Sequence, residues 1–483
     1  MNPWIDRFKK QVEAPATPVF YYHADTHDFL FMQDTSKGSG LADWVPLRAR
    51  EAAMALGHRG YRLTPAEGEQ LSQVEIMLNE CRMDPDRTIY YAGDLAGWSS
   101  GLHTVCGVNV LVKSEAKVPE AVQGDCSIVR RFIDTLFGPV QSVYVHAWIK
   151  QSRAALIARN LRAMPALMII GERNCGKSFF QQRVLTPMLG GRAANANRYL
   201  GEGSTKFNAD VLSKEHIMVQ DPELGSRFKD RVAFATRIKE IIANETQSIE
   251  RKFVQAINSQ VFSRVSITLN STYEVVSKLP VFDRDFSDKA FLLKAHKADF
   301  TVRAYTPEEQ RSYLELFASQ IPAYCWWLEN EFTIPAEITM EPDGSPTRWG
   351  IRCYHDPDTM GLLTAVSPEL RLMELVRQAL FTAPDASGSG VRSAEADFVQ
   401  MTALDLERAL KDDSSPVKHE AIALIKNGNA LISYLARLHA NFPDNVFSVK
   451  RGGNRTVWTI RKPDEILEIS DRCYEGLGGN NGQ

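Results

Sequence analysis

The spacing of apolar residues predicts short strands and longer helices along the whole chain. In the first 125 residues the apolar runs are four or five residues long, which is typical of strands. These runs cover 19–22, 29–32, 88–91 and 108–112. The first two flank a polar segment at 24–28 and predict a hairpin, which a helix over 47–56 follows. We therefore predict an N-terminal α+β domain over residues 1–125, with a role in oligomerisation or DNA contact.

The pattern changes after residue 125. Apolar residues recur at helical spacing from Cys126 to Lys150, and a second helix then precedes the apolar run 166–170, which predicts a buried strand. A further apolar run, 217–219, and a strand-like segment, 265–269, are each followed by polar residues. We predict an α/β core with a parallel sheet over residues 126–305.

Helical spacing dominates the next stretch. It covers 306–332 and 368–381, and a segment rich in Ala, Ser and Gly follows. Residues 306–390 are therefore predicted to be a helical extension that ends in a linker.

Residues 391–470 predict a winged-helix-like domain. Two amphipathic helices, 402–410 and 429–439, precede two short strands, 446–449 and 457–460, that flank a glycine-rich basic tip. Helix, helix and hairpin in this order outline a winged helix, whose basic residues grip phosphates in DNA-binding examples. The candidates for such contacts are Lys450, Arg451 and Arg455. A structural or protein-contacting role is an equal alternative, and residues 471–483 form a polar tail.

Composition narrows the class of protein. The 483 residues carry a formal net charge of −3, which excludes a uniformly basic nucleic-acid binder but permits a local basic channel. The seven cysteines are scattered without a C-x-x-C pair, so neither a disulfide framework nor a zinc site is predicted. The first residues are polar and charged, and no apolar run approaches the roughly 20 residues that span a bilayer. We expect a cytoplasmic protein of a bacterial or phage-infected cell, neither secreted nor bound to membranes.

The segment between the predicted strand 166–170 and the helix after it matches G-x-x-x-x-G-K-S. Its residues are Gly171, Glu172, Arg173, Asn174, Cys175, Gly176, Lys177 and Ser178, followed by Phe179. Glycines let backbone N–H groups surround phosphate oxygens, and the helix N-terminus adds partial positive charge. Lys177 would bind the β- and γ-phosphates, and the Ser178 hydroxyl would bind Mg²⁺. The segment predicts a site for ATP and Mg²⁺, with a chance match as the alternative.

A second candidate follows the apolar run 217–219. Asp221 lies 44 residues after Lys177 and would hold Mg²⁺, while a neighbouring acid would polarise the attacking water. Pro222 separates the two acids. Either Glu223 reaches the attacking water, or Asp221 acts as the base and Gln220 holds the coordination shell of the metal. An acidic turn that closes a core strand is the structural alternative.

Asn270 ends the next predicted strand, 265–270. Ligands of parallel sheets lie beyond the carboxyl ends of the strands, so the glycine-rich segment, Asp221 and Asn270 are expected at one edge. Asn270 would then contact the γ-phosphate or the attacking water. An asparagine that merely opens a turn is the alternative.

Basic residues gather between these two strands. Residues 227–264 contain eight Lys or Arg against four Asp or Glu. Arg251 and Lys252 are predicted at the tip of a hairpin that contacts a single strand, although a solvated helix face is an equal alternative. Arg284, or failing that Lys289, is predicted to act in trans on a neighbouring subunit's nucleotide. Either residue could instead form an ordinary surface ion pair.

Taken together, these segments resemble the helicase part of phage- and mobile-element-borne primase-helicases, in superfamily three of the AAA+ ATPases. The resemblance covers about 90–470 and is strongest over 165–295. It rests on the segments 91–97, 171–178, 189–192, 206–208, 216–223, 251–253, 269–270 and 279–289, and more weakly on 402–410. The Asp-Pro-Glu order departs from the two adjacent acids of the family, and the finger arginine is not clearly placed.

The resemblance implies roles for single residues and an assembly. Lys177 and Ser178 would bind phosphate and Mg²⁺, Asp221 the metal, and Asn270 would sense the γ-phosphate. Lys252 would face DNA within a homohexameric ring around single-stranded DNA. Because the first 125 residues show no primase acid cluster, we expect priming activity on a separate chain.

The predicted function is an ATP-dependent, ring-forming DNA helicase or translocase in replication of a phage or integrated mobile element. An initiator or regulator that uses ATP as an assembly switch without unwinding carries the same motifs. A nucleic-acid-sensing defence NTPase is a third alternative.

Overall fold

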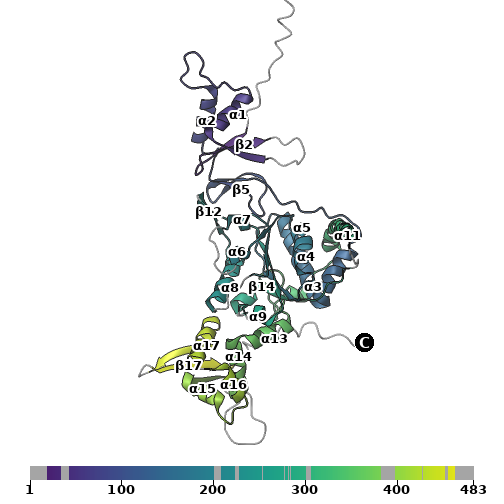
Figure 1. Ribbon diagram of the computed structural model, residues 1–483, viewed down its shortest axis with the longest axis vertical. Coiled ribbons are helices and arrows are strands. Elements are labelled where there is room, and N and C mark those ends of the chain that lie inside the picture. The colour runs from purple at the N-terminus through teal and green to yellow at the C-terminus, as the bar shows by residue number, and fades with distance from the viewer. Residues whose placement is uncertain are drawn as a thin grey trace, which may run out of the picture.

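The protein is a mixed α/β molecule with several sheets, seen here in a computed structural model. The structure describes residues 19–33, 43–200, 208–222, 228–252, 254–276, 278–280, 282, 284–300, 306–381, 397–426, 428–451 and 455–462. Figure 1 shows an elongated arrangement, with the N-terminal strands at one end, the largest α/β part in the middle and the C-terminal strands at the other end.

Two small sheets form the N-terminal part. The first has the order β3-β2-β1-β4, and the second has the order β5-β7-β6. Their strands are β1 (Phe20–His23), β2 (Phe29–Gln33), β3 (Asp43–Leu47), β4 (Thr88–Ile89), β5 (Tyr91–Gly93), β6 (Gly101–Val105) and β7 (Val108–Val112). Helices α1 (Ala49–His58) and α2 (Gln73–Met83) pack on the first sheet.

The predicted hairpin is confirmed, since β1 and β2 pair antiparallel, and α1 confirms the predicted helix. The predicted strand 88–91 is wrong as one unit. Tyr90 separates β4 from β5, and these two strands belong to different sheets.

The middle of the molecule contains the predicted parallel sheet. Five strands pair in the order β14-β8-β13-β10-β9, and every pair is parallel. The strands are β8 (Ala166–Gly171), β9 (Ala193–Asn195), β10 (His216–Gln220), β13 (Arg264–Asn270) and β14 (Ala290–Ala295). All six residues of β8 are buried, as its uninterrupted apolar run predicts.

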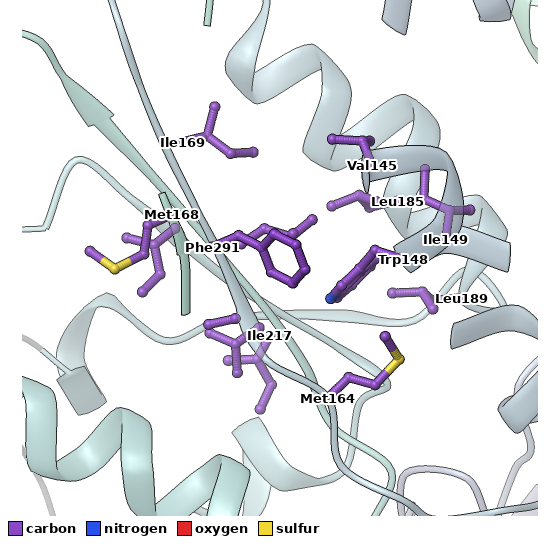
Figure 2. Packing of buried hydrophobic residues seen from close by; sticks show 14 of the residues in the cluster. Val145, Trp148, Ile149, Met164, Met168, Ile169, Leu185, Leu189, Ile217 and Phe291 are labelled. Carbon is purple, nitrogen blue, oxygen red and sulfur yellow. The ribbon is translucent and has the colours of Figure 1, made fainter. Parts of the chain in front are cut away.

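Helix α3 (Ser127–Ile157) packs on this sheet. It consists of two helical stretches that meet at a kink at Gly138 (φ 71°), before Pro139. The sequence also predicts two helices here, but it places their boundary near Lys150, well after the observed kink. Figure 2 shows Trp148 of α3 beside Phe291 of β14 and Leu185 of the helical segment after β8. Trp148 is fully buried, so this packing fixes the helical layer against the strands.

The remaining elements of the middle part are mainly helical. A continuous helical segment follows β8 and comprises α4 (Lys177–Phe179), a π-helix (Phe180–Leu185) and α5 (Thr186–Met188). The others are α6 (Asn197–Leu200), α7 (Ala209–Leu212), α8 (Phe228–Ala243), α9 (Tyr273–Val276), α10 (Arg284–Ser287), α11 (Pro307–Ser319), α12 (Ile321–Asn330) and α13 (Pro357–Val366). Helix α14 (Pro368–Val376) follows, but its buried residues pack in the core of the C-terminal part. A second π-helix (Arg377–Phe381) follows α14, and a hairpin of β11 (Gln247–Arg251) and β12 (Val254–Ser259) lies between α8 and β13.

The C-terminal part has a separate core. Its elements are β15 (Phe398–Thr402), α15 (Ala403–Lys411), α16 (Lys418–Leu424), α17 (Gly428–Asn441), β16 (Val446–Arg451) and β17 (Arg455–Arg461). The sheet order is β15-β17-β16, antiparallel throughout. Leucines of α15 and α17 pack with Trp458 in a cluster distinct from the central one. The helices α15 and α17 and the final hairpin match the sequence expectation, whereas β15 and α16 were not predicted.

Across the residues described, no helix is both long and apolar enough to cross a membrane.

Candidate functional site

The glycine-rich segment forms a tight loop between β8 and α4. Asn174 (φ 60°) and Gly176 (φ 119°) both adopt left-handed backbone conformations. Gly171 also requires its residue type, because a Cβ there would lie 2.6 Å from the Ala295 carbonyl oxygen. Backbone turns of this kind in front of a helix create concave groups of N–H donors. The loop therefore has the geometry of an anion-binding turn.

Lys177 is the buried cation of this loop. Its side chain is only 7% exposed. The ammonium donates to the carbonyl oxygens of Gly171 (2.8 Å) and Glu172 (2.6 Å) and lies 3.7 Å from Cys175 Sγ. These partners are neutral, and none of the ion pairs found among the described residues includes Lys177. The loop consequently holds a positive charge without a carboxylate beside it.

The other loop residues differ in exposure. Ser178 is exposed at the start of the helical segment, and Cys175 is buried. Phe179 is half-buried, with its ring 5.0 Å from Phe132 and 5.0 Å from Phe317. The structure thus uses Phe179 to anchor the helix to the core. The exposed members of the loop are Glu172, Arg173, Asn174 and Ser178.

Asp221 and Asn270 lie at the same sheet edge as this loop. Asn270 ends β13 and pairs in register with Gly171, the last residue of β8. Asp221 follows β10, on the other side of β13, and its N–H donates to the Thr268 carbonyl (2.9 Å). The parallel arrangement therefore brings together the three features that the sequence predicts at one edge.

Asp221 also has an unusual backbone. It is exposed and adopts a positive φ of 42°, which non-glycine residues rarely do outside tight turns and functional sites. Pro222 comes directly after it, and Glu223 lies outside the described residues. The strained turn places the Asp221 carboxylate immediately beyond the end of the strand.

The sequence argument missed Gln181, which links the loop helix to two strands. Its amide nitrogen donates to the Ser266 carbonyl (3.0 Å) and to Ser266 Oγ (2.9 Å). Its amide oxygen accepts from the side chain of Gln220 (3.1 Å), the residue before Asp221. Gln181 is fully buried. The sequence gives no clear signal for this role, because Gln182 and Arg183 directly after it are polar as well.

The basic insert folds into α8 and the hairpin of β11 and β12. Arg251 donates to the Ala92 carbonyl (2.8 Å) and the Tyr91 hydroxyl (3.0 Å), and its guanidinium lies 4.3 Å from the Tyr91 ring centre. Arg251 therefore joins the hairpin to β5 within the chain, instead of standing free at the tip as predicted. Lys252 is exposed at the hairpin tip.

The two candidates for action in trans differ in environment. Arg284 begins α10, and its side chain lies outside the described part of the structure. Lys289 is 7% exposed and bound to Asp285 (2.8 Å) and Asp288 (2.8 Å). Burial opposes its charge, but the two carboxylates outweigh this effect and raise the pKa of Lys289. Lys289 thus forms ion pairs within its own chain, the alternative that the sequence left open for it, with acids one and four residues before it.

The predicted DNA contacts of the C-terminal part lie on β16 and β17. Lys450 is exposed on β16, and Arg451 pairs in register with Arg455 at the end of the hairpin. Figure 1 shows this part well separated from the parallel sheet. The fold does not bring these residues to the loop of Lys177.

Comparisons with known proteins agree with the fold and leave the activity open. A family of unknown function (DUF5906) matches residues 169–285, from β8 to α10. No curated protein matches the chain. An apo structure of the NrS-1 C-terminal region is similar with a TM-score of 0.51 at 11% identity, over 92% of this chain and 96% of that one. A second apo structure of that region gives 0.50 at 12% identity with the same coverage. These similarities show a shared fold.

Proposed function

We propose that this chain is a ring-forming, ATP-dependent DNA helicase or translocase with a P-loop AAA+ core, of the superfamily-three type. The observation that carries the proposal is the buried, carboxylate-free ammonium of Lys177 in a glycine-rich loop. Asp221 and Asn270 stand at the same strand edge. A cation held by neutral carbonyls can exchange these partners for phosphate oxygens at low cost, because phosphate restores the missing counter-charge.

The residues at the edge suit a Mg²⁺–ATP complex. In proteins Mg²⁺ usually takes one or two side-chain oxygens and completes its shell with water and substrate phosphates. The exposed Ser178 hydroxyl and the exposed Asp221 carboxylate supply such oxygens. When bound, Mg²⁺ would offset the charge that develops on the transferred phosphoryl group.

Each remaining residue has a defined task in this proposal. The loop N–H groups and Lys177 bind the phosphates, and Asn270 donates to the γ-phosphate or positions the attacking water. Asp221 or Glu223 accepts the proton of that water. With Lys289 bound to two aspartates, Arg284 is the remaining candidate for a cation inserted into the site of a neighbouring subunit.

The DNA-related part of the proposal rests on the basic residues. Lys252 at the hairpin tip contacts a single strand inside a homohexameric ring. The C-terminal part is a winged-helix-like domain that grips phosphates with Lys450, Arg451 and Arg455. Priming is assigned to a separate chain, and the setting is replication of a phage or integrated mobile element.

The replacement Lys177→Ala tests the core of the proposal. It should abolish ATP turnover and leave the circular dichroism spectrum unchanged, because Lys177 contacts only loop carbonyls and a thiol. Lys117→Ala, which removes an exposed lysine, is the matched control and should hydrolyse ATP at the parent rate. Persistent hydrolysis in Lys177→Ala would refute the assignment of the loop.

An ATP-switched initiator or regulator without unwinding activity is the second candidate, which the Asp-Pro order after β10 favours. Strand displacement on a forked duplex separates the two functions. The helicase displaces the strand with ATP, whereas the switch assembles on DNA and displaces none.

A further inference from the structure

A cavity of about 390 Å³ lies at the edge of the parallel sheet where the strands begin. Its walls come from the segment 160–163 after α3, the end of α8, the base of the β11–β12 hairpin and residues 348–349. Ser263 of the lining directly precedes β13, whereas Asn270 ends that strand. The seven residues of β13 span roughly 20 Å, at about 3.3 Å per residue. The cavity is therefore separate from the candidate nucleotide site at the other edge.

Three arginines gather at this cavity. Arg162 and Arg348 line it and are exposed. Arg264 is fully buried, and its guanidinium donates to the carbonyl oxygens of Arg162 (2.9 Å) and Ser263 (3.0 Å), so it lies against the wall from inside. The acid found in the described lining is the exposed Glu245. The local charge is therefore positive, in a chain whose net charge is −3.

The hydrogen bonds of two of these arginines go to neutral groups. Arg162 donates to the Arg348 carbonyl oxygen. Besides the two wall carbonyls, Arg264 donates to Ser152 Oγ (2.9 Å). None of the ion pairs found in the described part of the chain includes Arg162 or Arg264. Burial, and then the nearby charge of Arg162, lower the pKa of Arg264 to about 9, so an anion in the cavity would stabilise its charged form.

Arg348 is held at the mouth of the cavity by weak contacts. Its guanidinium lies 4.5 Å from the ring centre of Trp349, which also lines the cavity. It lies 3.5 Å from Asp288 in an exposed ion pair. Exposed pairs of this kind contribute little in water, so the guanidinium can turn to a better acceptor.

Two buried donors at the wall have no hydrogen-bond partner among the described residues. They are the Ser263 hydroxyl and Nη2 of Arg264. Ser263 is 7% exposed and belongs to the lining. Buried polar groups of native proteins are almost always hydrogen-bonded, to protein, water or ligand. A wall with unused donors and a positive charge is thus suited to an anion that accepts several hydrogen bonds.

We propose that this cavity binds a phosphate group, carried by a small ester such as a sugar phosphate or present as free phosphate. The inference goes beyond the proposed function, because ATP hydrolysis and strand movement use the other edge of the sheet. A phosphate ester carries about −1.5 to −2 charge at neutral pH and three terminal oxygens. These oxygens match the guanidinium groups of Arg162 and Arg348 and the Ser263 hydroxyl.

The rest of the cavity suits a small polar molecule. Its volume falls within the range of about 300–1,000 Å³ that is usual for small-ligand sites. Asn244 and Gln260 line it with exposed amide side chains, which can both donate to and accept from hydroxyl groups. A sugar attached to the phosphate would therefore find hydrogen-bond partners there.

The test is isothermal titration calorimetry with ribose 5-phosphate, without nucleotide or Mg²⁺. Arg162→Ala should weaken binding roughly tenfold or more, because it removes charge-assisted hydrogen bonds to the phosphate. Ser263→Ala should weaken it severalfold. Arg311→Ala, which removes an exposed arginine outside the cavity, is the matched control and should bind as the parent does. Parent-like affinity in Arg162→Ala, or no binding to the parent protein, would overturn the proposal.

Two further titrations identify the group that is recognised. Inorganic phosphate should displace ribose 5-phosphate, and ribose should not. The tighter binder of the two phosphate compounds decides between an ester and free phosphate as the source of the group. Ribose that binds as tightly as ribose 5-phosphate would show that the phosphate is not recognised, and the proposal would be wrong.

Hydrogen exchange locates the ligand in the unmodified protein. Bound ribose 5-phosphate should slow exchange in segments 160–163 and 260–263 at least severalfold and leave the loop 171–178 unchanged. Slower exchange confined to the loop would place the phosphate at the candidate nucleotide site and contradict the proposal. Lys177→Ala should bind ribose 5-phosphate normally, so loss of ATP turnover and loss of binding in this cavity are separate outcomes.

Discussion

His216, at the start of β10, is a single buried residue that connects the elements which carry the candidate site. It is fully buried, and its ring nitrogens lie 2.8 Å from Thr186 Oγ1 and 2.7 Å from Ser266 Oγ. Burial lowers the pKa of His216 from 6.5 to about 3. The ring is therefore neutral in the folded protein at neutral pH and joins the loop helix to two neighbouring strands.

This burial predicts acid sensitivity. The pKa of His216 is lower in the folded state, so unfolding takes up a proton at any pH between about 3 and 6.5. The stability that His216 contributes is therefore complete above pH 6.5 and is lost as the pH falls below that value. The free energy of unfolding from urea titrations should fall by about 1.4 kcal/mol per pH unit below 6 through this residue. His216→Gln should flatten that dependence.

His419→Gln is the control for this prediction, because His419 is exposed. It should keep the parent's pH profile. Parallel profiles for His216→Gln and the parent would contradict the assignment to His216. His355, also buried, with a pKa lowered by burial, acts in the same direction and remains in both variants.

At the scale of elements, side-chain contacts of Arg251 join the β11–β12 hairpin to β5. Arg251 reaches Tyr91 and Ala92, and a Cβ on Gly93 would lie 2.2 Å from the Arg251 guanidinium. Asn208 adds three hydrogen bonds to the hairpin, with the backbone of Glu250 (2.8 and 3.3 Å) and of Ser248 (2.8 Å). The hairpin is thereby tied to the N-terminal strands on one side and to α7 on the other.

Gly93→Ala should release one side of this joint. The added methyl group displaces the Arg251 guanidinium, which costs about 2 kcal/mol through loss of the cation–π contact and the charged hydrogen bonds. Hydrogen exchange of the hairpin amides should accelerate by more than tenfold, and Arg251→Ala should reproduce the effect. Gly361→Ala, where a Cβ meets open space, is the matched control. Unchanged exchange in Gly93→Ala would show that the guanidinium relocates without loss.

Elements were predictable wherever the local pattern decides the structure. The apolar run of β8 is uninterrupted, and β10 and β13 carry β-branched and other apolar residues at their centres, so parallel strands could be predicted from them. The break at Tyr90 and the position of the kink in α3 were missed, because sheet partners and helix packing decide them.

The candidate site was also predictable only in part. Asp221 follows β10 and Asn270 ends β13, and the geometry of parallel sheets then puts both beside the glycine-rich loop. Arg251 and Gln181 were not predictable in their observed roles. Arg251 contacts residues about 160 positions away, and Gln181 lies in a helix that shows its buried face only in three dimensions.

At the scale of the whole molecule, a buried ion network joins the middle part to the C-terminal part. Glu369 of α14 is fully buried, 2.9 Å from the guanidinium of Arg231 on α8 and 3.6 Å from that of Arg437 on α17. Helix α8 begins seven residues after Asp221. One carboxylate therefore bridges a helix near the sheet edge and a helix of the separate C-terminal core.

Glu369→Gln should weaken this connection strongly. It removes the carboxylate that lies 2.9 Å from the nearly buried Arg231, and breaking a comparable buried pair costs about 3–5 kcal/mol. Thermal unfolding followed by circular dichroism should shift to lower temperature. Glu308→Gln, at an exposed position of α11, should leave the curve unchanged.

Replacing both partners gives a sharper check. Arg231→Met/Glu369→Leu should lose less stability than Glu369→Gln, because apolar residues of similar size remove the unpaired charge. If the double variant is the less stable one, packing at this position matters more than the ion network.

The π-helix at Phe180–Leu185 affects how this chain is aligned with others. A π turn closes between residues five apart instead of four, so it accommodates one residue more than the α-helical turn it replaces. A gap-free alignment with a relative that has a plain helix after the loop would run out of frame by one position from Thr186 onward. An aligned profile should open a gap within 180–185, so that β9 and β10 are matched to their true counterparts.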